Sequence, residues 1–228
     1  MDWFPLLNSL RVALLATLLL FFPAMFAAQR VMRLSSAPLR GVWDVFLSLS
    51  LVLPPPVLGW LTLLCFGPNH AFGYWTRQLF GLRLVMAWPA EAFVAALTAF
   101  PLLYRVARRS FERFPSDIVD TARTLGRSDA WIFWRIQVPM CRRGIIAGTL
   151  LAFGRALGEY GATYMVAGYV PGRTATVATS VYRFWSGGDD PRAFIWVLIS
   201  VLLSVAFLTA VSVMEDRERR YGIGGETP

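Results

Sequence analysis

The sequence has no lysine, a single histidine and only two cysteines, and it is poor in charged residues. Charged residues make up 16% of the 228 positions, whereas a soluble domain carries about 25%. The mean hydropathy of the chain is +0.52. These shortages exclude an ordinary soluble domain and predict a membrane protein.

The cysteines and the histidine show no metal-binding pattern. Cys65 and Cys141 fit no metal-ligand spacing. On the topology derived below they lie near opposite membrane faces, which excludes a disulfide between them. His70 lies in a Gly-Pro-Asn-His turn, where we expect a loop residue and no ligand. We therefore expect no metal site.

No motif in the sequence indicates catalysis. There is no GxxxxGK[ST] loop that would bind the phosphates of ATP, and the glycine-rich piece Gly222–Gly225 has no strand before it. The apolar segments contain neither paired aspartates nor a His-Glu-x-x-His motif, which disfavours a membrane-embedded enzyme. We expect no catalytic residue and no cofactor in this chain.

The positive charge of the chain does not indicate nucleic-acid binding. The formal net charge is +8, and every basic side chain other than the histidine is an arginine. The arginines lie between apolar runs and do not form one patch. We expect a membrane-lipid environment and no nucleic acid.

Five apolar segments are long enough to cross a bilayer, since about twenty helical residues span a hydrocarbon core of ~30 Å. They predict an all-α, polytopic protein with five transmembrane helices at residues 12–28, 45–66, 84–104, 144–168 and 193–214. A cleaved signal peptide is the alternative for the first segment, but Asp2 and a lone Arg11 make a poor basic leader. Between the last two segments we expect a short helix at residues 175–185, at the membrane surface or re-entrant.

The distribution of arginine predicts the orientation of the chain. The segments 29–44, 105–143 and 215–228 share one side of the membrane and carry 15 arginines, whereas the segments on the other side carry 6. The positive-inside rule makes the first set cytoplasmic. We therefore expect an external segment 1–9, a membrane domain 10–214 with a cytoplasmic loop at 115–140, and a cytoplasmic tail 215–228.

Two features inside the apolar segments leave alternatives open. Pro54, Pro55 and Pro56 remove three backbone donors and must break or kink the second segment, either for packing or as a wall of a transport pathway. Arg155 and Glu159 lie four residues apart in the fourth segment, on one helical face. They form either an internal salt bridge between spans or a gate that guides an anion.

A polar island of about twenty residues, DTARTLGRSDAWIFWRIQVP, separates the third and fourth segments. Its glycine allows a sharp turn between two short helices, and small residues beside it allow the close approach of another surface. The residues that carry this pattern are Asp120, Thr121, Ala122, Gly126, Ile136, Val138 and Pro139. Trp131 to Trp134 add a bulky apolar cluster. We expect a docking surface at an aqueous face.

This island resembles the coupling loop of permease subunits of ATP-binding-cassette importers, which begins Glu-Ala-Ala and ends Ile-x-Leu-Pro. Asp120, Thr121 and Val138 depart from that pattern but keep charge or approximate size. Residues 51–60, 100–111 and 151–182 also resemble the molybdate branch of these permeases. The stretch 151–182 includes the pathway candidates Arg155, Glu159, Thr163, Arg173 and Thr174.

The resemblance implies a type I permease fold and a working unit of several chains. Two permease copies form the pathway, two cytoplasmic ATPases hold ATP and magnesium, and a periplasmic protein delivers the oxyanion. Sulfate permeases share the Arg-Ala-Leu-Gly-Glu phrase, so sulfate, thiosulfate and tungstate stay open beside molybdate. A non-transporting structural subunit of the bacterial inner membrane and a proton-coupled transporter are the rival classes. The coupling loop argues against the first, and the arginine beside Glu159 argues against the second.

Overall fold

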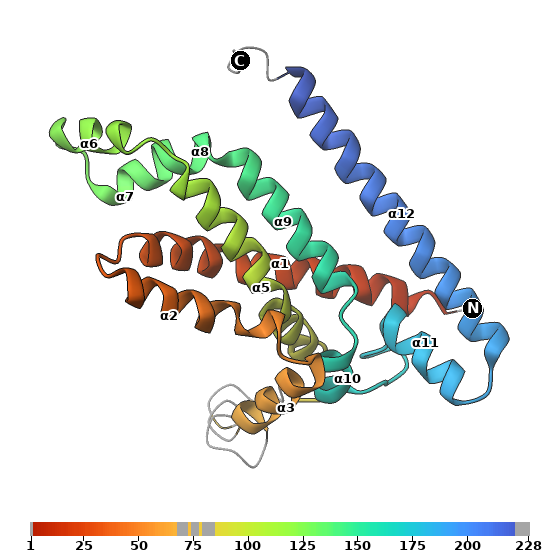
Figure 1. Cartoon of the computed structure of the whole chain (residues 1–228). Helices are drawn as coiled ribbons and strands as arrows, with labels where there is room; N and C mark the ends of the chain where they lie inside the picture. Colours follow the sequence, from red (N-terminus) through yellow and green to blue (C-terminus); the bar gives the residue numbers. More distant parts are fainter. Residues whose placement is uncertain (1, 68–72, 74–77, 79–84, 222–228) are drawn as a thin grey trace.

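The computed structural model describes residues 2–67, 73, 78 and 85–221, with side chains to Val213, and every regular element in these ranges is a helix (Figure 1). The all-α prediction is therefore confirmed for this part of the chain. Most of the expected external loop 67–83, with His70, lies outside the described residues, as does the Gly222–Gly225 piece.

Three helices form the core: α1 (Phe4–Met32), α5 (Trp88–Glu112) and α9 (Arg142–Leu157). Small side chains face each other across α1 and α5, and they let the two backbones approach closely. The fully buried alanines of this seam are Ala13, Ala16, Ala24, Ala28, Ala95, Ala99 and Ala107. Pro89 lies in the first turn of α5, where its missing N–H does no harm.

The second apolar segment is broken, as its prolines predict. It consists of α2 (Ala37–Ser48), the 3₁₀ turn η1 (Leu49–Leu51) and α3 (Pro55–Phe66). The axes of the two parts differ by 103°. Pro54 precedes α3, and Pro55 and Pro56 lie in its first turn, where a missing N–H does no harm.

The fourth apolar segment is also broken, which the sequence analysis did not predict. α9 ends at Leu157 and a separate helix, α10 (Gly161–Ala167), follows after a bend at Gly158–Tyr160. The 16 residues of α9 rise only about 24 Å, less than a ~30 Å hydrocarbon core. The expected continuous helix at 144–168 is therefore wrong.

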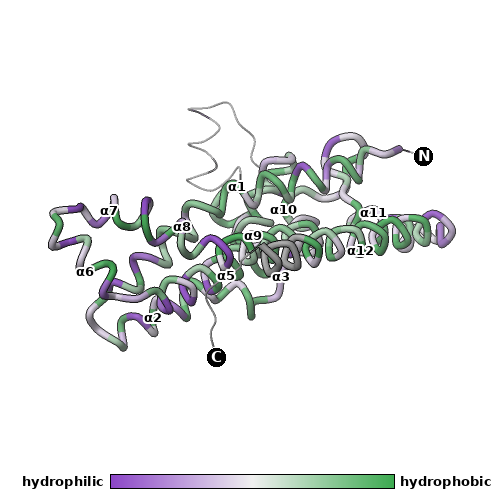
Figure 2. The backbone as a smooth tube through the Cα atoms, turned by 90° about the horizontal axis from the view of Figure 1, so that it is seen from above, coloured by the Kyte–Doolittle hydropathy of each residue, from purple (hydrophilic) through white to green (hydrophobic). Residues whose placement is uncertain are grey.

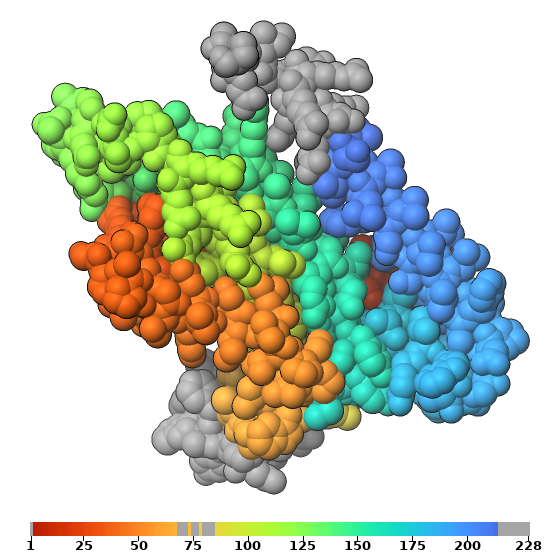
Figure 3. Space-filling view, viewed as in Figure 1, coloured from red at the N-terminus to blue at the C-terminus, as the bar shows by residue number. Residues whose placement is uncertain are grey.

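The expected surface helix and the last span are both present as helices, α11 (Val177–Ser186) and α12 (Asp190–Tyr221). α12 packs against α11 and meets α9 mainly through Phe207, whose ring lies 5.3 Å from that of Phe153. Only 6% of its most apolar stretch is buried, and it stands beside the rest of the molecule in the space-filling view (Figure 3). Lipid or another protein must cover it.

Five membrane spans are not confirmed. Within the described residues three helices, α1, α5 and α12, are long and apolar enough to cross a membrane, and the bent pair α2–α3 raises the number to four if it counts as one span. The short helices α6 (Ser116–Thr124), α7 (Asp129–Ile132) and α8 (Val138–Met140) lie at one end, which is markedly more hydrophilic than the middle of the molecule (Figure 2).

Candidate functional site

The polar island forms the expected pair of short helices joined at a glycine. α6 ends at Thr124 and α7 begins at Asp129, with Gly126 between them at a φ of 76°. The Gly126 N–H donates to the carbonyl oxygen of Arg123, and the Arg127 N–H donates to that of Ala122. No atom lies within 4 Å of the position that a Gly126 Cβ would take, so the tip of this turn is open to an incoming surface.

Two side chains of the bulky apolar cluster 131–134 attach this loop to the core. Ile132 and Phe133 are buried, and the ring of Phe133 lies 5.3 Å from that of Phe111 on α5. Trp131 and Trp134 remain exposed, with the Arg127 guanidinium 4.7 Å from the Trp131 ring centre. The loop therefore has a buried base on α5 and an exposed aromatic face.

Asp129 connects the loop to the end of α1. Its carboxylate accepts from Arg33, at the C-terminal end of α1, at 2.9 Å and from Arg123 of α6 at 3.0 Å. These hydrogen bonds, the one from Arg123 first, hold the pKa of Asp129 below its ordinary value. Asp129 is thus ionised at neutral pH and joins α1, α6 and α7.

The wide π-type turn η2 (Phe133–Gln137) leads into the closing Pro139. Proline has no N–H for the carbonyl of the fourth preceding residue, here Arg135, and its ring would clash with it in a regular α-helix. A wider turn at this point accommodates the proline. It places Pro139 at the surface and leaves Ile136 and Val138 half-buried.

The opening residues of the island occupy different environments. Asp120 lies in the second turn of α6 and not at its start, and it forms an ion pair with Arg123 at 3.0 Å. Thr121 is exposed, whereas Ala122 is buried. Leu125 is 75% exposed at the tip, an unusual position for a large apolar side chain in contact with water.

A second group of predicted residues meets where α9 breaks. Arg155 lies in the last turn of α9, and its guanidinium is 2.8 Å from the Glu159 carboxylate. The same carboxylate accepts from the Ala162 N–H at 2.9 Å, at the start of α10. Glu159 therefore caps α10 while it pairs with α9, and the two residues do not share one continuous helix.

The proline break and the glycine break lie against each other. A Cβ on Gly161 would lie 3.1 Å from the Pro56 ring and 3.2 Å from Pro55. A Cβ on Gly59 would lie 2.7 Å from the Met165 Cβ. α3 and α10 thus pack at glycine-limited distance. Thr163 is buried, and its hydroxyl has no hydrogen-bond partner in the described part of the chain.

Arg173 and Thr174 lie apart from that break, on the turn between α10 and α11. The Thr174 hydroxyl donates to the carbonyl of Ala167 and accepts from the Val170 N–H, so its polar atoms close this turn. Arg173 is exposed. Beside the turn, Asn8 of α1 donates to Ala175, and the Val177 N–H donates to Ser9.

Sequence reasoning missed two residues of the loop, Asp129 and Leu125, and the partner of Asp129 on α1, Arg33. Arg33 and Asp129 are 96 positions apart, and no local pattern indicates that they pair. Leu125 directly precedes Gly126. An apolar residue at a turn that is predicted to be exposed could have indicated a contact residue there. Among the described residues, no cluster of histidine, cysteine and acidic side chains could hold a metal ion.

The geometry offers one exposed loop surface and one buried polar break, and comparisons with known proteins give the family of the chain. Residues 20–220 match the family described as "Binding-protein-dependent transport system inner membrane component". The molybdenum transport system permease protein ModB of Escherichia coli is 34% identical, over 97% of each chain.

Two further comparisons bear on substrate and fold. The sulfate transport system permease protein CysW of Synechocystis is 29% identical over 79% of this chain and 65% of its own. A solved bacterial ABC transporter that imports alginate superposes with a TM-score of 0.73 at 15% identity, over 94% of this chain and 78% of its own.

Proposed function

The chain belongs to the family of binding-protein-dependent transport system inner membrane components, and from this we propose that it is the membrane-spanning permease subunit of an ATP-driven importer for molybdate. The assignment of molybdate rests on the 34% identity with the molybdenum permease, which covers nearly all of both chains. The sulfate relative is less similar and extends well beyond the matched region. We keep sulfate, thiosulfate and tungstate as alternative substrates.

The α6–α8 loop is the proposed contact with an ATPase. Its exposed tip, with Leu125 and the open Gly126 turn, offers a small protruding surface, whereas Ile132 and Phe133 fix its base to α5. A force on this tip would reach α5 through that base and α1 through Asp129 and Arg33. ATP and magnesium would be held by the partner.

The proposed cycle is a two-state movement of rigid helices. Closure of two ATPases around ATP would carry the loops of two permease copies with it, and the helices attached to each loop would tilt. The Arg155–Glu159 pair lies at the α9–α10 break, where such a tilt would change the distance between helices. It serves there as a brace or as a gate.

A second permease copy and lipid are the proposed neighbours in the membrane. α12 and the outer side of α1 expose large apolar side chains, and such surfaces need an apolar environment. Asn8, near the start of α1, contacts Ala175, and Arg33, at the end of α1, contacts Asp129 of the α6–α8 loop. The turn before α11 and the α6–α8 loop therefore lie at opposite ends of α1. This supports an external amino terminus, a periplasmic binding protein at that end, and a cytoplasmic carboxyl terminus.

Reconstitution tests the proposed substrate. The permease, its ATPase and its binding protein in proteoliposomes should take up labelled molybdate only with ATP, and an excess of unlabelled sulfate should compete poorly. Uptake of sulfate in preference to molybdate would assign the chain to the alternative. Failure to take up any oxyanion, with an active ATPase in the complex, would contradict the proposed function.

A further inference from the structure

A basic cavity lies between α2 and the last turns of α5, and neither site described above includes it. Its volume is about 340 Å³, within the ~300–1,000 Å³ usual for small-molecule sites. Arg105, Arg108 and Arg109 line it, together with Asp44 and Glu112. Three of its charged side chains are thus cations and two are carboxylates.

Both carboxylates are engaged by the central arginine. Arg108 forms an ion pair with Asp44 of α2, and its Nε donates to Glu112 at 2.9 Å. Asp44 also accepts from the Tyr104 hydroxyl. Arg108 is therefore held in place, and its charge is compensated.

The five charged side chains of the lining sum to +1, because its two carboxylates offset two of its three arginines. Arg105 and Arg109 lie one helical turn apart on the same face as Arg108, and neither forms an ion pair with any described residue. Arg40 lies one turn before Asp44 on α2, and its buried Nε has no hydrogen-bond partner in the described part of the chain. The region therefore has four guanidinium groups and two carboxylates, and Arg105 and Arg109 have no carboxylate partner among the described residues.

The planar guanidinium group donates two parallel hydrogen bonds to an oxyanion, which is why arginine is preferred for bidentate anion recognition. We propose that this cavity binds a tetrahedral oxyanion between Arg105 and Arg109, with Arg108 fixed beside them by Asp44 and Glu112. The phosphate of an acidic lipid and a free inorganic oxyanion share this chemistry. The proposal of an oxyanion site depends only on the geometry of this cavity. The proposed function is needed only for the claim that the occupant is the transported oxyanion.

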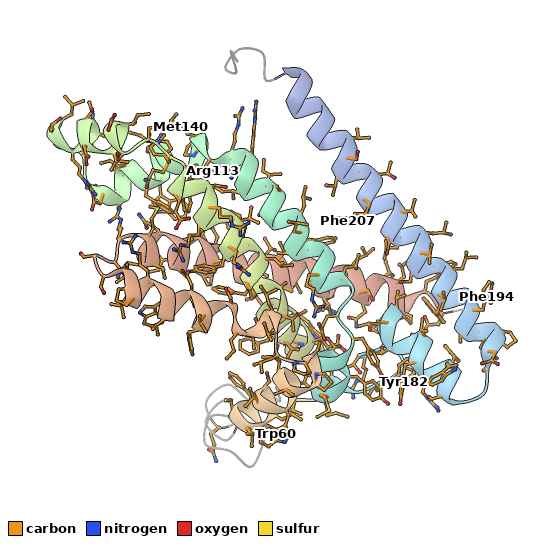
Figure 4. The ribbon with its side chains drawn as sticks, viewed as in Figure 1. Trp60, Arg113, Met140, Tyr182, Phe194 and Phe207 are labelled. Carbon is orange, nitrogen blue, oxygen red and sulfur yellow. The ribbon has the colours of Figure 1, made fainter. Side chains whose placement is uncertain are left out.

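Binding to the purified permease–ATPase complex tests this site with two probes. One arm measures labelled inorganic molybdate on delipidated complex, and the other counts retained phosphatidylglycerol against phosphatidylcholine by native mass spectrometry. We compare the wild type with Arg105→Gln/Arg109→Gln. The matched control, Arg113→Gln/Arg142→Gln, also removes two exposed arginines; Arg113 lies at the end of α5 (Figure 4), outside the cavity lining.

We expect one of the two probes to bind at least tenfold more weakly to the cavity variant and to keep its wild-type affinity for the control. Weaker binding of molybdate would identify the occupant as a free oxyanion, and weaker binding of phosphatidylglycerol would identify it as a lipid phosphate. Equal binding of both probes to the cavity variant and the control would overturn the proposal. Neither arm requires uptake, so a failure of transport and a failure of this site are separate results.

A measurement on the wild type covers the case in which the cavity variant does not assemble. Phenylglyoxal modifies accessible arginines, and peptide mass spectrometry locates the modified positions. Molybdate or phosphatidylglycerol should protect Arg105 and Arg109 but not Arg113. Equal modification of all three with and without each probe would overturn the site.

Discussion

At Gly126 the backbone adopts a left-handed conformation, with φ of 76°, and a Cβ there would meet nothing within 4 Å. A side chain at this position costs roughly 1 kcal/mol of backbone strain, except that asparagine tolerates the region better than alanine does. If backbone strain decides, asparagine at position 126 should disturb ATPase binding less than alanine. If exclusion of a partner surface decides, the larger asparagine should disturb it more.

Gly126→Ala and Gly126→Asn separate strain from exclusion. We expect the ATPase to bind Gly126→Asn more weakly than Gly126→Ala, because the larger side chain extends from an open tip towards the partner. Co-purification of the ATPase and its dissociation constant give the ranking. The reverse order would show that the turn conformation matters and that no partner surface approaches it.

Glu159 has two structural roles, so its variants should not be equivalent. Gln keeps an acceptor for the Ala162 N–H and loses the charge that pairs with Arg155, whereas Ala loses both. Loss of such a cap costs about 0.5–2 kcal/mol. We expect Glu159→Gln to assemble better than Glu159→Ala, measured as the yield and melting temperature of the purified complex.

The double reversal Arg155→Glu/Glu159→Arg tests whether the pair acts as a gate or only as a brace. It restores an ion pair but places a donor where α10 needs an acceptor, so assembly should recover only in part. Uptake that recovers in proportion to assembly would indicate a brace. Assembled complex without uptake would indicate that the orientation of the pair matters for the anion.

At the scale of elements, the two breaks differ in how far the sequence predicts them. Pro54–Pro56 break the second apolar segment for a local reason, the missing N–H groups, and this was predictable. The break at Gly158–Tyr160 combines a local cap, Glu159 on the Ala162 N–H, which hydropathy does not report, with the tertiary approach of α3. Hydropathy alone therefore predicted one long helix there.

The same division holds for the α6–α8 loop. The glycine turn between two short helices followed from the local spacing, and the positive φ at Gly126 confirms that turn. The attachment of the loop did not follow, because Phe111 and Arg33 lie in distant helices. A single sequence contains no periodicity that reports such pairs.

Substitution of three helical glycines tests the packing of α3 on α10. Gly59→Ala should lower stability most, by roughly 1–3 kcal/mol for an overpacked site, since its Cβ would lie 3.0 Å from the Ala162 carbonyl as well as against Met165. Gly161→Ala should cost less. The control Gly41→Ala on α2 meets nothing within 4 Å and should stabilise by about 0.5–1 kcal/mol.

Thermal unfolding of the complex in detergent gives the order of the three glycine variants. Equal melting temperatures for Gly59→Ala and Gly41→Ala would mean that α3 and α10 do not pack as described.

At the scale of the whole molecule, the orientation in the membrane follows from which loops share an end. Ser116 of α6 and Ser186 of α11 are both exposed, and serine to cysteine is a small change. In a background without Cys65 and Cys141, an impermeant maleimide should label position 186 in intact cells and position 116 only after permeabilisation. Labelling of position 116 from outside would contradict the orientation.

The central claim is that the α6–α8 loop couples this permease to an ATPase, and Gly126→Asp tests it most directly. Gly188 is a matched control, because it has a φ of 75°, has no atom within 4 Å of a Cβ and lies between α11 and α12. The measurement is ATP hydrolysis and molybdate uptake in proteoliposomes, with and without loaded binding protein. We predict that Gly126→Asp inserts normally but loses the ATPase or substrate-stimulated hydrolysis, together with uptake, whereas Gly188→Asp keeps its ATPase. A Gly126→Asp complex that retains its ATPase, with full stimulated hydrolysis and uptake, would contradict the account.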